Sequence, residues 1–112
     1  MSITTHVLDI ARGRPADGVT VILERLLAGE WSAIGRGTTD ENGRLATLTE
    51  ERSVTPGTYR LTFDIGDYQR DHGISVPFFP VATITFNVRD VSDSYHVPLL
   101  LSPYGYSTYR GS

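Results

Sequence analysis

Short runs of this chain alternate apolar with polar residues, the pattern of β-strands that bury one face. In "GVTVILERL", for example, Val19, Val21 and Leu23 fall on the same side of an extended backbone, and β-branched residues suit such a strand. The predicted strands are 3–10, 18–26, 31–39, 43–48, 58–65, 82–88, 94–102 and 106–110. About eight short strands at this spacing are typical of a two-sheet antiparallel β-sandwich.

Turn residues separate these strands, and one segment has helical character. Gly, Pro, Asp and Asn gather in "RGRPADG" (12–18), "DENG" (40–43) and "SPYG" (102–105). The segment "DIGDYQRDHG" (64–73) predicts a short helix with Gly73 placed to end it. The expected fold is therefore all-β with one short helix.

The last two predicted strands, 94–102 and 106–110, are apolar and lack the lysines or bulges that protect a free sheet edge. We expect them to pair with another subunit, which makes a homo-oligomer with two-fold contacts between these strands.

Size and charge limit the classes of protein that remain. The 112 residues are expected to form a single domain, 1–112, and a net charge of −3 gives no basic surface for nucleic acid. The apolar runs are too short to span a membrane, and the first residues do not form a signal peptide, so we expect a cytoplasmic protein, with a periplasmic or peroxisomal one left open. With no cysteine, thiolate nucleophiles and zinc–thiolate sites are excluded.

Few side chains can carry chemistry, and each has an ordinary structural interpretation when it is taken singly. His6 and His96 lie within predicted strands, where a hydrogen-bonded histidine is common, and Arg44 follows the "DENG" turn, where an exposed strand end is common. His72, at the end of the predicted helix, is expected to cap that helix or to be solvated. His6 and His96 without a carboxylate partner make a poor zinc site, so no metal is expected.

Three segments together resemble the 5-hydroxyisourate hydrolases, the transthyretin-related enzymes of purine catabolism. They are "TTHVLDIARGRPADGVTVIL", "DENGRL" and "YHVPLLLSPYGYSTYRGS", in that order and over nearly the whole chain. The resemblance implies a transthyretin-like β-sandwich that forms a homotetramer, a dimer of dimers with active sites in a central channel. Val81-Ala82 and the polar segment 64–73 depart from the family pattern.

The resemblance also implies an activity. These enzymes open the lactam of 5-hydroxyisourate, giving 2-oxo-4-hydroxy-4-carboxy-5-ureidoimidazoline on the way from urate to allantoin, and no cofactor is expected. The family's catalytic positions fall on His6, Arg44 and His96. Either histidine could be the general base, and Ser112 would relay or position the water. Arg44 would orient the urate-like ring and stabilise the oxyanion.

The closing residues "YRGS" match the family's terminal motif. Tyr109 is expected to contact the substrate ring, and Gly111 to allow close approach of the backbone, with His6 and Arg44 completing the substrate-binding set. Arg110 is expected to face away and pair with a carboxylate. Ser112 would bring a hydroxyl and the terminal carboxylate into the site, so an extension is expected to reduce activity.

A second interpretation is a transthyretin-like carrier that binds a small molecule or hormone without turnover. By the resemblance, carriers lack the His6, Arg44, His96 and "YRGS" features, which favours the enzyme.

Overall fold

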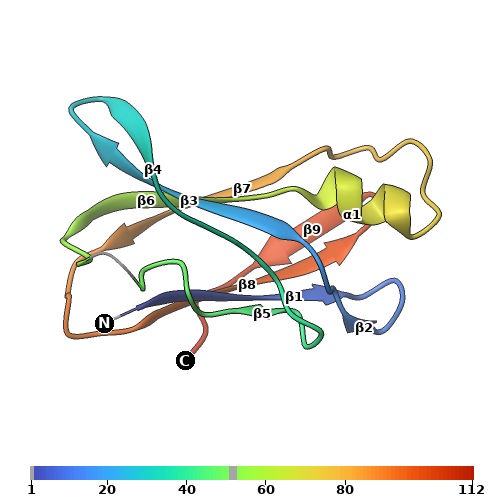
Figure 1. The fold of residues 1–112 in the computed structure, drawn as a ribbon, viewed down its shortest axis with the longest axis horizontal. Helices are drawn as coiled ribbons and strands as arrows, with labels where there is room; N and C mark the ends of the chain where they lie inside the picture. Colours follow the sequence, from blue (N-terminus) through green and yellow to red (C-terminus); the bar gives the residue numbers. More distant parts are fainter. Residues whose placement is uncertain (1, 51–52) are drawn as a thin grey trace.

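Two β-sheets packed face to face make up the computed structural model, which describes residues 2–50 and 53–112 (Figure 1). The first sheet has the strand order β2-β1-β8-β9, with β5 also paired to β1, and the second has the order β4-β3-β6-β7. The strands are β1 (Ile3–Asp9), β2 (Arg14–Pro15), β3 (Thr20–Leu27), β4 (Glu30–Thr38), β5 (Arg44–Leu45), β6 (Gly57–Phe63), β7 (Ala82–Val88), β8 (Tyr95–Ser102) and β9 (Gly105–Thr108). The predicted all-β sandwich with one short helix is confirmed.

The alternation seen in the sequence becomes the division between core and surface. Along β1, Ile3, Thr5 and Val7 are buried, while Thr4 and His6 between them are half-buried on the opposite side. The same alternation on the other strands fills the space between the sheets with one apolar cluster, in which the largest side chains include Tyr59, Phe63, Leu61 and Leu99. The face of the first sheet that carries Thr4 and His6 is turned away from this core, and we call it the outer face.

The first sheet contains one parallel pairing in an otherwise antiparallel fold. β1 runs parallel to β8, with Thr4 opposite His96 and His6 opposite Pro98. Parallel neighbours need a long connection, and here nearly the whole chain lies between the two strands. This pairing brings the start of the chain next to its end.

Three predictions about individual strands were wrong. β8 lies between β1 and β9, so segment 94–102 is an interior strand and only β9 lies at that edge. Segment 12–18, read as a turn alone, contains the two residues of β2, which pair with β1. Segment 43–48 forms only the two-residue strand β5, because the chain turns away from β1 after Leu45.

The helix α1 (Ile65–Asp71) lies at one end of the sandwich, as Figure 1 shows. Asp64 caps its first turn by accepting a hydrogen bond from the Asp67 amide at 3.2 Å, and Gly73 follows its end with a φ of 92°. The Tyr68 hydroxyl donates to Asp9 Oδ2 at 2.8 Å, which ties the helix to the first sheet. Burial, and then this carboxylate, raise the pKa of Tyr68. The helix has 7 residues, whereas roughly 20 are needed to cross a membrane. Among the described residues, no helix is long and apolar enough to span a membrane.

Candidate functional site

Strand register brings three of the predicted site residues together on the outer face of the first sheet. His6 of β1 lies opposite Arg44 of β5, and Thr4 of β1 lies opposite His96 of β8. Residues that face each other on neighbouring strands point to the same side, and so do residues two apart on one strand. Both imidazoles and the guanidinium therefore share one surface.

A hollow of about 260 Å³ opens in this surface. It is lined by Thr4, Thr5, Arg44, Leu45, Ala46, Ser94, His96 and Ser112. Three predicted site residues, Arg44, His96 and Ser112, thus meet around it, while His6 lies beside it on β1. We call this space the outer-face hollow.

The "DENG" turn holds Arg44 at the edge of the outer-face hollow. The Asp40 carboxylate accepts hydrogen bonds from the amides of Asn42 and Arg44, both at 2.9 Å. Gly43 has a φ of 75°, which favours glycine, and its carbonyl accepts from the Val7 amide at 2.7 Å. The turn is therefore fastened to β1, and β5 begins at a defined place opposite His6.

The same turn fixes the proton of His6. Nε2 of His6 lies 2.8 Å from the Asn42 carbonyl oxygen. A carbonyl only accepts, so Nε2 carries a hydrogen and donates it. In the neutral imidazole the lone pair is then on Nδ1, which has no hydrogen-bond partner among residues 2–50 and 53–112.

His96 has a different environment. Its Nδ1 lies 2.8 Å from the Thr4 hydroxyl oxygen. Burial lowers the pKa of His96, and the positive charge of Arg44 and the neighbouring His6 lower it further. His96 is therefore neutral at pH 7. The sequence contained no sign of Thr4 as a partner, because only the parallel register of β1 and β8 places the two residues opposite each other.

The end of the chain returns to His96. After β9, Gly111 forms an isolated bridge with His96, and its amide donates to the His96 carbonyl at 2.7 Å. A Cβ atom on Gly111 would lie only 2.5 Å from Cδ2 of the imidazole. Glycine is required here because the backbone itself packs against the ring.

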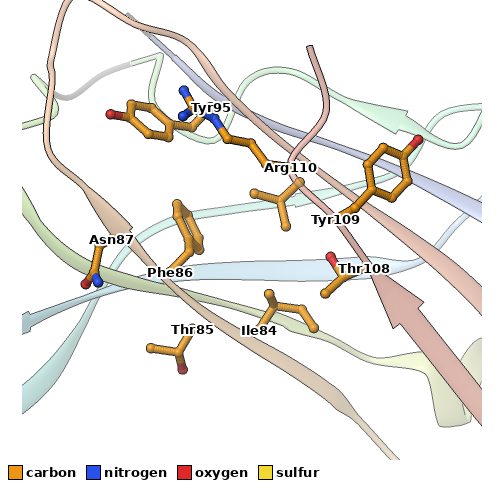
Figure 2. Close-up of a pocket in the computed structure, with 9 residues that line it drawn as sticks. Ile84, Thr85, Phe86, Asn87, Tyr95, Thr108, Tyr109 and Arg110 are labelled. Carbon is orange, nitrogen blue, oxygen red and sulfur yellow. The ribbon is translucent and has the colours of Figure 1, made fainter.

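Arg110 and Tyr109 point in opposite directions (Figure 2). The Arg110 guanidinium lies 3.7 Å from an Asp93 carboxylate oxygen and 4.6 Å from the centre of the Tyr95 ring, so the predicted carboxylate partner is confirmed. Tyr109 is 57% exposed. Because Ser107 lies opposite Leu100 on the outer face, alternation sends Tyr109 to that face also, although it does not line the outer-face hollow of this chain.

A second hollow of about 260 Å³ lies at the edge of the sandwich, between β7 and the end of the chain (Figure 2). Its lining is Ile84, Thr85, Phe86, Asn87, Tyr95, Val97, Thr108, Tyr109 and Arg110. It contains none of the three histidines.

His72 stands apart from both hollows. It is the C-cap residue of α1, its Nδ1 lies 2.8 Å from the Tyr68 carbonyl, and its ring stacks on Tyr68 with 4.2 Å between ring centres. The predicted capping role is confirmed. Within the described residues, no three acidic or histidine side chains come together as a metal site would require.

The fold and the site define a class of protein, a transthyretin-like β-sandwich with two histidines and an arginine on the outer face of one sheet. Residues 3–111 match the HIUase/Transthyretin family, and the chain belongs to that family.

This chain is similar over nearly its whole length to both hydrolases and transthyretins, as three known proteins show. A 5-hydroxyisourate hydrolase of Deinococcus radiodurans is 46% identical over 98% of this chain and 95% of its own length. The structure of Klebsiella pneumoniae 5-hydroxyisourate hydrolase matches 99% of this chain and 98% of its own, with 39% identity and a TM-score of 0.85. The structure of sea bream transthyretin in complex with thyroxine matches 99% of this chain and 95% of its own, with 33% identity and a TM-score of 0.91.

Proposed function

We propose that this protein hydrolyses 5-hydroxyisourate, opening the lactam to give 2-oxo-4-hydroxy-4-carboxy-5-ureidoimidazoline in the degradation of urate to allantoin. The observation that carries the proposal is the convergence of His6, Arg44, His96 and Ser112 on one face of the first sheet. Hydrolase relatives of 39% to 46% identity support it.

Lactam hydrolysis needs a base for the attacking water and positive charge or hydrogen-bond donors for the oxyanion. We assign the base to His6, because the Asn42 carbonyl holds the hydrogen on Nε2 and leaves the Nδ1 lone pair for a proton from water. A positioned base of this kind contributes about 10²–10⁴ in rate.

Arg44 provides the charge. Its planar guanidinium presents several N–H donors, which suit the oxygen and nitrogen edge of a urate-like ring and the developing oxyanion. Ser112, at the rim of the outer-face hollow, would position the water, and Tyr109 would contact the ring of the substrate.

The alternative is a carrier without turnover, and the fold alone does not separate the two because the transthyretin structure also matches closely. The side chains of the outer face separate them. Two histidines and an arginine on one face, with His96 and Arg44 lining a hollow, are the groups that a hydrolytic reaction uses. A site that only holds an apolar molecule has no need of a base.

We also infer a homotetramer, a dimer of dimers. The strands β7 and β9 are free edges of the two sheets in the single chain, and edges of this kind pair readily with a second copy. Phe78 and Tyr104 are 65% and 80% exposed and their rings lie 6.1 Å apart, an apolar surface of the kind that subunit contacts cover. Light scattering measures the mass directly, and a monomer at micromolar concentration would contradict the inference.

Ultraviolet spectroscopy on freshly generated 5-hydroxyisourate tests the activity. The protein should accelerate decay well beyond the spontaneous rate, and it should not need added metal or cofactor. Calorimetric titration with thyroxine tests the carrier. Tight thyroxine binding without any acceleration of decay would reject the hydrolase in favour of the carrier.

A further inference from the structure

We propose that Thr4 is a positioning residue for His96: its hydroxyl donates to Nδ1 and holds the neutral imidazole in the tautomer that carries its hydrogen on Nε2. The contribution of Thr4 to catalysis rests on the proposed hydrolase function. The tautomer of His96 is independent of that function, because it is argued from the contacts of the folded protein alone.

Counting donors and acceptors within the protein favours one direction for this hydrogen bond. The Thr4 hydroxyl has one hydrogen to donate, and among residues 2–50 and 53–112 its one hydrogen-bond partner is Nδ1 of His96 at 2.8 Å. The hydroxyl of the next residue, Thr5, has its own acceptor, the Val97 carbonyl at 2.6 Å. If Nδ1 carried the hydrogen, the Thr4 oxygen would accept it, and the hydroxyl hydrogen would have to turn towards the open hollow that Thr4 lines. We assign the direction that uses the hydroxyl hydrogen within the protein, so that Thr4 donates and Nδ1 accepts.

Packing holds the ring in the orientation that this bond requires. Gly111 lies against the Cδ2 edge of the imidazole so closely that a Cβ atom would come within 2.5 Å of Cδ2. A ring flip exchanges Nδ1 with Cδ2, so it would break the bond to Thr4 and turn a polar nitrogen towards Gly111. Thr4 and Gly111 thus hold two edges of one ring from opposite ends of the chain.

The result is a pair of histidines with opposite tautomers on one surface. His6 gives its Nε2 hydrogen to the Asn42 carbonyl and keeps a bare Nδ1, whereas His96 accepts at Nδ1 and keeps an N–H at Nε2. One imidazole is then a proton acceptor and the other a hydrogen-bond donor. A site that removes a proton from water and stabilises a new oxyanion uses one of each.

Long-range ¹H–¹⁵N correlation spectra of protein labelled at histidine nitrogens read the tautomer without substrate. At neutral pH the wild-type His96 should show an unprotonated Nδ1 and a protonated Nε2. Thr4→Ser keeps the hydroxyl and should keep this pattern. Thr4→Val keeps the shape and the strand preference but removes the donor, and the ratio of the two tautomers should fall about fivefold, as for one lost hydrogen bond.

Thr5→Val is the matched control. It removes the neighbouring hydroxyl, which is buried and donates to the Val97 carbonyl rather than to His96, so it should lower stability and leave the His96 nitrogen signals as in the wild type. A protonated Nδ1 in the wild type would overturn the proposal, even if Thr4→Val failed to fold. An unchanged tautomer ratio in folded Thr4→Val would overturn it also.

Kinetics test the catalytic part. One lost hydrogen bond changes an equilibrium or a rate by up to about tenfold, so Thr4→Val should lower kcat by about five- to tenfold with little change in KM. Thr4→Ser should restore most of it. If kcat did not fall in Thr4→Val, Thr4 would have no positioning role in catalysis. A wild-type protein with the predicted tautomer but no hydrolysis of 5-hydroxyisourate would reject the proposed function and support the assignment of Thr4.

Discussion

The contact between Gly111 and His96 allows a prediction whose size can be worked from the structure. In Gly111→Ala, the new methyl carbon would lie 2.5 Å from Cδ2 of His96, whereas ordinary contacts begin near 3.4 Å. The backbone of Gly111 has no positive φ, so the contact alone excludes alanine. The imidazole or the end of the chain must therefore move by about 1 Å, and a displacement of that size in a catalytic group costs on the order of 10²-fold in rate.

Steady-state hydrolysis and urea unfolding together measure the effect. In Gly111→Ala, kcat/KM should fall about 10²-fold, while the free energy of unfolding should change by only about 1 kcal/mol, the value of the hydrogen bond from Gly111 to the His96 carbonyl. Gly105→Ala is the matched control, since a Cβ there meets its nearest atom, Ser102 Oγ, at 3.8 Å. Wild-type kcat/KM in Gly111→Ala would refute the reasoning that this glycine holds His96.

The other predictions concern charge, helix docking and the turn before Arg44. An NMR titration should show His96 gaining its proton below pH 6.5. Arg44→Ala should raise the pKa of His96, because a nearby positive charge is removed, and an unchanged pKa would contradict the influence of Arg44 on His96. Tyr68→Phe should lower the free energy of unfolding in urea by about 1–3 kcal/mol, because the buried Asp9 loses a donor; equal stability would contradict the docking role. Asp40→Ala should lower kcat/KM because Arg44 is displaced, and Asp40→Asn, which keeps an oxygen acceptor, should restore part of it. The same kcat/KM in both variants would contradict the role of the Asp40 oxygen in positioning Arg44.

Local pattern predicted those parts of the fold that local chemistry decides. Alternation in segment 18–26 placed Val19, Val21 and Leu23 on one side of the strand, and the structure buries all three in the core. Gly73 ends the helix for the reason inferred from the sequence, since its φ of 92° suits a residue without a side chain.

The local pattern could not predict which strands pair when they lie far apart in the sequence. The parallel pairing of β1 with β8 joins residues about ninety positions apart, and alternation in either strand is the same whichever neighbour it has. For this reason segment 94–102 was assigned to an edge, whereas it lies inside the sheet.

The candidate site divides in the same way. His6, Arg44 and His96 came from the family resemblance, while their separate sequence contexts favoured ordinary structural roles. The partners that fix their geometry, the Thr4 hydroxyl and the Asn42 carbonyl, depend on register and on the shape of a turn. A backbone carbonyl in particular leaves no residue type to recognise, because every residue has one.

The central claim is that the charged and imidazole groups of the outer face carry out hydrolysis. The most direct test compares kcat/KM for 5-hydroxyisourate among the wild type, His6→Ala, Arg44→Ala and His96→Ala, with His72→Ala as the control histidine at the end of α1. The first three variants should keep the fold and the oligomer and lose about 10²-fold or more in kcat/KM, whereas His72→Ala should stay close to the wild type. Normal turnover in His6→Ala, Arg44→Ala and His96→Ala would contradict the assignment of the active site to this face.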